Sequence, residues 1–133
     1  MTSFISHTTV NAVDAYKQSE WWKQVLGYED MPGDPNLPGH EECMIRKPDG
    51  SHHLLFIDVD NAKPDGVRNR IHFDLRPAEG SRDEELERLL GLGASVVDDL
   101  RGKYGPGTGW VVLADPEGNE FCILRSEAEL ETS

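Results

Sequence analysis

The sequence is poor in cysteine and has no long apolar run. Its two cysteines, Cys43 and Cys122, cannot form the disulfide framework of a small secreted domain. No apolar segment approaches the ~20 residues that a membrane-spanning helix needs. The first residues, MTSFISHTTV, lack the basic and apolar regions of a secretory signal. We therefore expect a soluble, cytoplasmic protein.

Basic residues are also scarce. The chain of 133 residues has 13 Lys and Arg against 25 Asp and Glu, which gives a formal net charge of −12. A surface of this charge repels the phosphates of nucleic acids and the head groups of anionic membranes, so we expect neither as a partner. The length is that of one ordinary domain, and we expect residues 1–133 to form a single one.

Two helices are indicated by their capping residues. Asp14 precedes apolar residues at helical spacing that run to about Leu26, and Gly27 is suited to end that helix. Ser81 is followed three residues later by Glu84, the pattern of a capping box, which predicts a second helix. Segments rich in glycine and proline predict loops at residues 31–40, 60–69 and 101–109.

The remaining segments have the composition of strands. In the clearest of them, residues 71–76, apolar and polar side chains alternate, so that His72, Asp74 and Arg76 share one face. The apolar residues of the same segment are expected to pack on a core. The acidic end of the chain, residues 126–133, is expected to fray. The predicted strands span about residues 4–10, 41–47, 52–59, 70–76, 95–99, 110–114 and 119–125.

The order of these elements repeats along the chain. His7 and His72, each in a strand that precedes a helix, are 65 residues apart, and the turn glycines Gly50 and Gly118 are 68 apart. This offset predicts an α+β fold of two βαβββ modules. We expect a cup-shaped, mixed and antiparallel sheet with helices on its convex face and a small-molecule site on its concave face. The predicted modules span about residues 4–59 and 70–125.

Several sequence words resemble the vicinal oxygen chelate superfamily, which includes glyoxalase I, extradiol dioxygenases, fosfomycin-modifying enzymes and bleomycin resistance proteins. The most specific word, WVVLADPEGNEFCILR, is similar to those of its glyoxalase-like subgroup, and the resemblance covers about residues 4–125. Members are commonly dimers, so the resemblance also implies a homodimer. The words that carry it are WWKQVLGYE at 21–29, HFDLRP at 72–77, LGLGA at 90–94 and WVVLADPEGNEFCILR at 110–125.

The resemblance implies a divalent metal, such as zinc, iron, nickel or manganese. Carried over by position, it makes His7 and His72 metal ligands. The usual fourth ligand, a glutamate four residues after the turn glycine, is replaced by Cys122. Glu120 lies two residues earlier and shares the strand face of Cys122, so either residue is a candidate for that place. With Glu120 the predicted set is His7, His72 and Glu120.

One position departs from the pattern. The second ligand is expected to be an acid on the strand after Gly50, but the candidate positions there, Leu54 and Phe56, are apolar. The standard set of four ligands is therefore incomplete. Purely structural roles are also open. His7 can be a hydrogen-bonded, half-buried side chain, and Cys122 can be a small buried apolar group.

Two functions are consistent with these residues. One is a metal-dependent lyase or isomerase of the glyoxalase type, or a dioxygenase, in which Glu120 transfers a proton with a pKa raised by its apolar surroundings. The other is a metal-free protein that binds a small cationic molecule such as an antibiotic. In the second function Trp110, Phe56 and Asp74 form the pocket and Glu120 is the counter-ion. The predicted substrate-binding residues are Asp74, Trp110, Phe56 and Cys122.

Overall fold

The computed structural model describes residues 1–131, so the last two residues of the predicted acidic tail lie outside the described part. The chain divides into two compact units, Met1–Ala62 and Lys63–Ser133, which we call unit 1 and unit 2. No helix within residues 1–131 is long and apolar enough to cross a bilayer. Each unit is described by itself below.

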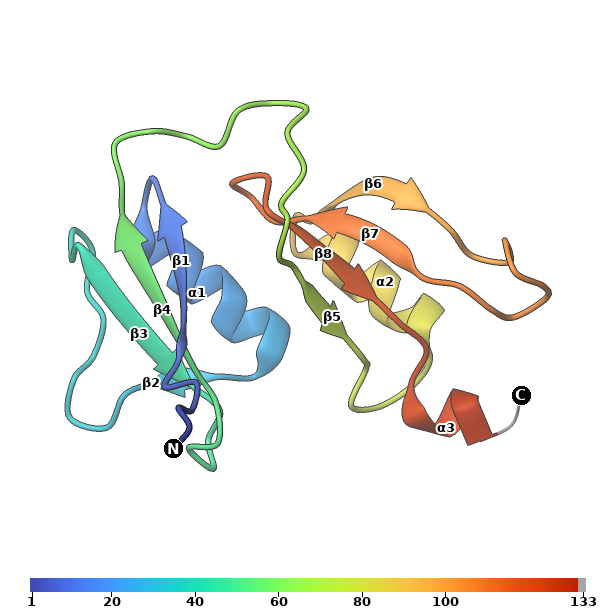
Figure 1. The fold of residues 1–133 in the computed structure, drawn as a ribbon, viewed down its shortest axis with the longest axis horizontal. Helices are drawn as coiled ribbons and strands as arrows, with labels where there is room; N and C mark the ends of the chain where they lie inside the picture. Colours follow the sequence, from blue (N-terminus) through green and yellow to red (C-terminus); the bar gives the residue numbers. More distant parts are fainter. Residues whose placement is uncertain (132–133) are drawn as a thin grey trace. The chain divides into compact units, whose positions relative to one another are not determined.

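Unit 1 contains one helix and a four-stranded sheet (Figure 1). The strands are arranged in the order β1-β4-β3-β2, with β1 parallel to β4 and the other neighbours antiparallel. The short strand β2 was not predicted from the sequence. The elements are β1 (Thr8–Ala12), α1 (Ala15–Leu26), β2 (Glu29–Asp30), β3 (Glu42–Arg46) and β4 (His53–Asp58).

The limits of α1 follow from its end residues, as predicted. The side chain of Asp14 accepts a hydrogen bond from the backbone N–H of Lys17, and Gly27 ends the helix with a φ of 68°. Both Trp21 and Trp22 are buried, and their rings meet edge to face at 5.2 Å. The core beneath α1 comes from alternate residues of β3 and β4, namely Cys43, Ile45, Leu54 and Phe56, all fully buried.

Unit 2 repeats this arrangement. Its strands have the order β5-β8-β7-β6, with β5 parallel to β8 and the other neighbours antiparallel. The predicted α+β class of two βαβββ modules is therefore confirmed, and the strands pair in two four-stranded sheets, one in each unit. The elements of this module are β5 (Phe73–Leu75), α2 (Arg82–Gly91), β6 (Ser95–Asp99), β7 (Val111–Ala114) and β8 (Glu120–Ile123).

Helix α2 begins with the predicted capping box. The Ser81 side chain accepts a hydrogen bond from the N–H of Glu84, and the Glu84 carboxylate accepts one from the N–H of Ser81. The prediction of a frayed tail was wrong for residues 126–131, where a short helix, α3 (Glu127–Glu131), forms. The reason is a second reciprocal pair of hydrogen bonds, between Ser126 and Glu129.

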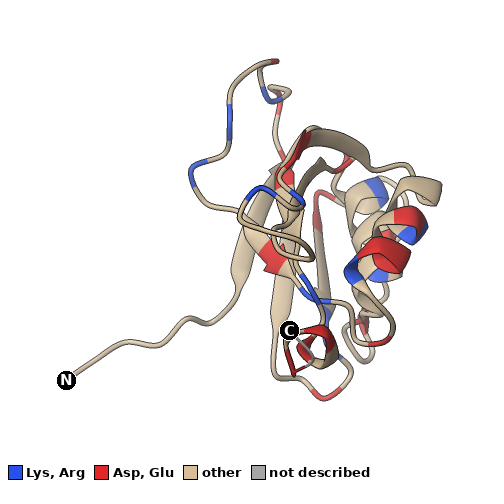
Figure 2. Cartoon of the chain, turned by 90° about the vertical axis from the view of Figure 1, so that its right-hand side faces the viewer, with Lys and Arg blue, Asp and Glu red and all other residues tan. Residues whose placement is uncertain are grey.

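Strands β5 and β1 begin three and four residues later than predicted, because pairing rather than composition decides where a strand begins. Strand β5 pairs with β8 only over Phe73–Leu75, so Ile71 precedes the sheet and is 85% exposed. The prediction that Ile71 packs on a core was therefore wrong. Likewise β1 begins at Thr8 rather than residue 4, and Phe4 and Ile5 are exposed on an extended trace that leaves the sheet (Figure 2).

Candidate functional site

A pocket of about 500 Å³ lies on the unit 2 sheet. The pocket is lined by Trp110, which directly precedes β7, by Val112 of β7, and by Glu120 and Cys122 of β8. The residues between them, Val111 and Phe121, are fully buried on the other face. Because side chains alternate along a strand, the pocket lies on the face opposite α2. Its lining residues are Arg68, Asn69, His72, Asp74, Asp98, Leu100, Trp110, Val112, Glu120, Cys122 and Leu124.

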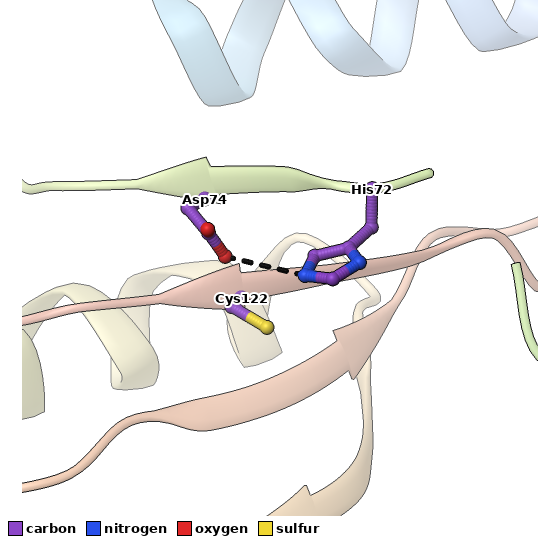
Figure 3. A group of neighbouring side chains, drawn as sticks. All are labelled: His72, Asp74 and Cys122. Atoms are coloured by element: carbon purple, nitrogen blue, oxygen red, sulfur yellow. Dashed lines mark ion pairs between the residues drawn. The ribbon is translucent and has the colours of Figure 1, made fainter. Parts of the chain in front are cut away.

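Three side chains of the kinds that can bind a metal meet in this pocket. His72 directly precedes β5, Asp74 lies in β5 and Cys122 lies in β8. The strand register pairs Asp74 with Cys122. One ligand atom of each lies within 4.8 Å of those of the other two. The His72 Nε2 atom is 3.4 Å from Asp74 Oδ1, as the dashed line in Figure 3 marks. The parallel pairing of β5 with β8 therefore assembles the group.

The Cys122 thiol carries its proton at neutral pH. Burial raises its pKa to about 11, with further contributions from the charge of Asp74 and a hydrogen bond to that residue. His72 and Asp74 are exposed, whereas Cys122 is only 5% exposed. The group thus combines two accessible ligands with one buried sulfur that binds a metal only after losing its proton.

The donor atoms of this group fit a divalent metal. In a tetrahedral site, bonds of 2.0–2.3 Å place neighbouring ligand atoms about 3.3–3.8 Å apart. The 3.4 Å between His72 and Asp74 lies within that range, and the outer limit of 4.8 Å needs a closing movement of about 1 Å. Mixed nitrogen, oxygen and sulfur donors suit zinc better than magnesium or calcium, which prefer oxygen.

Glu120 has a different environment from the one predicted. Its carboxylate lies 3.1 Å from Lys63 Nζ and 3.1 Å from Arg68 Nε, and it accepts a hydrogen bond from the backbone N–H of Asn69. Burial acts to raise the pKa of Glu120, but the contacts with Lys63 and Asn69 outweigh it and lower the pKa below its ordinary value. The expectation of a raised pKa was therefore wrong, because it left out these partners.

The aromatic wall of the pocket depends on the loop between β6 and β7. Trp110 stacks against Tyr104, with ring centroids 5.8 Å apart and planes at 18°. The buried guanidinium of Arg82 holds the loop by donating hydrogen bonds to the carbonyls of Thr108 and Gly109, at 2.8 and 2.9 Å. These hydrogen bonds attach the end of the loop to the start of α2.

The other predicted site residues belong to unit 1. His7 directly precedes β1 and is half-buried, with its Nδ1 atom 2.9 Å from the Ser6 hydroxyl. Phe56 is a fully buried core residue of β4. Elsewhere in unit 1, His52 is half-buried, and its Nδ1 atom is 2.7 Å from the Tyr28 hydroxyl. Unit 2 therefore brings together His72, Asp74, Trp110, Glu120 and Cys122.

Sequence reasoning missed the polar and charged residues that surround Glu120 and the pocket edge. Asp98 lines the pocket from the edge strand β6, where an exposed acid has no distinctive pattern. Lys63, Arg68 and Asn69 lie in a segment treated as a loop, and their contacts with Glu120 span about fifty residues of sequence. The one available signal was the buried acid itself, which requires a compensating partner.

Comparison with known proteins decides the family. The family model for the glyoxalase-like domain matches residues 7–124. The chain belongs to the glyoxalase-like domain family. This confirms the resemblance to the vicinal oxygen chelate superfamily. No curated protein sequence matches this glyoxalase-like domain.

Solved structures share the fold of the domain at low sequence identity. One of them is a variant of the fosfomycin resistance protein FosX from Listeria monocytogenes, complexed with Mn(II) and 1S,2S-dihydroxypropylphosphonic acid. Its sequence is 17% identical and its TM-score is 0.65, and the match covers 97% of this chain and 94% of the FosX chain. FosX from Mesorhizobium loti is 14% identical with a TM-score of 0.63 and full coverage of both chains. A Bacillus cereus protein described as a possible glyoxalase is 16% identical, with a TM-score of 0.58 and coverage of 92% and 99%.

Proposed function

We propose that the unit 2 pocket binds a small molecule with the help of a divalent metal held by His72, Asp74 and Cys122. The observation that carries the proposal is the convergence of these three donors in a pocket of ligand size. It is also supported by the Mn(II) complex of a FosX protein with the same fold. A bound divalent metal supplies Lewis-acid chemistry, which polarises an oxygen atom of the ligand.

The residues of the pocket have separate tasks in this proposal. Trp110 and the neighbouring apolar side chains of Val112 and Leu124 contact the carbon skeleton of the ligand and exclude water. Cys122 would lose its Sγ proton to solvent on becoming a ligand, and Asp74, which raises the pKa of that thiol, would bind the metal through its ionised carboxylate. These tasks fit a lyase, an isomerase or a dioxygenase of the superfamily.

The predicted roles of His7 and Glu120 are part of the proposal that rests on the resemblance. His7 is proposed as a further ligand, and Glu120 as a ligand or proton carrier. The lowered pKa of Glu120 keeps its carboxylate ionised and makes it a weak base at neutral pH. Phe56 remains a predicted substrate contact on the same grounds, and its side chain would have to become accessible, because it is fully buried in the core of unit 1. A homodimer and a cytoplasmic location also remain predictions.

A metal-free binding protein for a cationic molecule is the second candidate. The observation that favours it is a pair of exposed carboxylates, Asp74 and Asp98, which line the same pocket as Trp110. Carboxylates and an indole ring are the groups that bind organic cations. In this function the acids contact the ligand directly and His72 serves as a hydrogen-bonding partner of Asp74.

Metal analysis of protein without a histidine tag separates the two candidates. The proposal expects bound zinc, iron, nickel or manganese, and a rise in melting temperature when the metal-free protein receives one of them. His72→Ala is expected to abolish both effects, whereas the matched control His40→Ala, at an exposed position of unit 1, leaves them unchanged. If no metal binds and a panel of aromatic amines raises the melting temperature, the metal-free function is correct.

A further inference from the structure

Residues 63–69, which we call the rim strap, form an irregular segment that leads towards β5. Two of its residues, Arg68 and Asn69, line the pocket. The strap contains no helix or strand, and most of its residues are exposed. Figure 2 shows basic residues along the loop at the top of the view. A segment of this kind keeps a fixed place only where side chains tie it to the sheet.

The ties of the strap converge on one carboxylate. Lys63 Nζ is 3.1 Å from Glu120 Oε2, while Arg68 Nε and the backbone N–H of Asn69 are each 3.1 Å from Glu120 Oε1. A further hydrogen bond, 3.2 Å long, runs from Asn69 Nδ2 to Asn119 Oδ1 at the start of β8. Both ends of the strap are therefore joined to Glu120.

The burial of these groups makes Glu120 more important to the strap than a surface ion pair would be. The Glu120 side chain is 6% exposed and the Lys63 side chain 21%, whereas that of Arg68 is 58% exposed. Poorly hydrated charges have few alternative partners, so loss of one side leaves the other uncompensated. A neutral amide in place of the Glu120 carboxylate removes the electrostatic attraction that holds Lys63 and Arg68 against the sheet.

The strap also lies beside the buried sulfur of the pocket. Arg68 and Cys122 line the same pocket, and the charge of Arg68 acts on the Cys122 thiol. Glu120 lies two residues before Cys122 on the same face of β8, so the tied strap adjoins the least accessible of the three metal-ligating groups.

We propose that Glu120 is a positioning residue that ties the rim strap across the pocket, and that release of its carboxylate opens the way to Cys122. In the closed state the three contacts with Glu120 hold Arg68 and Asn69 at the pocket wall. In the open state these residues leave the wall and the pocket widens towards solvent. The device does not require a metal held by His72, Asp74 and Cys122. A ligand role for Glu120 would require release of its carboxylate from the strap, because both of its oxygens contact strap residues in the closed state.

Limited digestion with trypsin measures the state of the strap. Cleavage after Arg68 and Arg70 requires the strap to leave the sheet, whereas cleavage after Lys103 takes place in a loop with other anchors. Glu120→Gln is expected to speed the first two cleavages by about tenfold or more, as expected when a buried charge loses its partner. Cleavage after Lys103 stays at the rate of the unmodified protein, as do all rates in the control Glu127→Gln.

The two cysteines supply a second measurement. Alkylation of Cys122 by a maleimide is expected to accelerate in Glu120→Gln, while Cys43, fully buried in unit 1, keeps its slow rate. Lys63→Gln removes one tie and leaves the residues of the sheet intact, so cleavage after Arg70 should rise there too. Unchanged cleavage and alkylation in Glu120→Gln would overturn the proposal, and so would unchanged cleavage in Lys63→Gln.

Discussion

The loop that precedes Trp110 requires glycine at position 109, where the two sides of the loop approach closely. Replacement of Gly109 by alanine measures how much stability depends on this close approach. Its φ is +88°, and a Cβ atom there would lie 2.0 Å from the backbone oxygen of Leu100 and 3.0 Å from Cα of Arg101. These are backbone atoms of the opposite side of the loop, so no side-chain rotation relieves the overlap. The backbone at position 109 must instead move away from Leu100 and Arg101, and this displaces the neighbouring Trp110.

The expected cost can be compared with that of Gly107 in the same loop. Gly107 has a φ of +77°, but a Cβ atom added there would meet nothing within 4 Å. Gly107→Ala therefore costs only the left-handed backbone, about 1 kcal/mol in the free energy of unfolding after the gain from a less flexible unfolded chain. Gly109→Ala adds backbone overlap and weakens the Arg82 hydrogen bonds, so we expect at least about 3 kcal/mol.

Urea denaturation of the two variants, followed by far-ultraviolet circular dichroism, gives both free energies of unfolding. The reasoning predicts that the midpoint of Gly109→Ala falls well below that of Gly107→Ala. Trp110 fluorescence should change in Gly109→Ala even without denaturant, because the ring leaves its stack with Tyr104. Equal free energies for the two variants would refute the argument from the close approach of Leu100.

Other perturbations test separate parts of the structure. Arg101 hydrogen-bonds to Asp99 and lowers the pKa of Asp99 to about 2, from 3.8. The pair therefore stabilises the fold above pH 4, and this stabilisation disappears as the pH falls towards 2. In an acid titration, Arg101→Gln should lose less stability between pH 4 and pH 2 than the unmodified protein does. Arg82→Met should cost about 2–4 kcal/mol in urea denaturation, because two loop carbonyls lose their donor, against less than about 0.5 for the exposed Arg88→Met. Titration calorimetry should find weaker zinc binding in His7→Ala, and unchanged affinity would show that His7 is no ligand.

The features predicted well from the sequence are those that depend on neighbouring residues. The caps of α1 and α2 were located from Asp14, Gly27 and the capping box of Ser81, because each bonds within one turn of its own helix. The predicted repeat of two βαβββ modules is also confirmed, because the same local patterns recur in each half of the chain. Helix α3 had the same kind of signal in Ser126 and was missed only because its acidic composition suggested fraying.

The features predicted poorly depend on distant partners. Whether Ile71 packs on a core depends on how far β5 pairs with β8, and composition does not determine this. The pKa of Glu120 is set by Lys63, more than fifty residues earlier, so an argument from its strand alone predicted the wrong direction. The group of His72 and Asp74 with Cys122 likewise arises from parallel strand register, which joins residues about fifty positions apart.

The cobalt(II) spectrum of the tagless protein tests the central claim most directly. If Cys122 binds the metal beside His72 and Asp74, cobalt added to the metal-free protein should produce a thiolate-to-metal charge-transfer band in the near ultraviolet. Cys122→Ser should remove that band and Cys43→Ser, the matched control in the core of unit 1, should keep it. A band that persists in Cys122→Ser, or its absence from the unmodified protein, would contradict the proposed metal site.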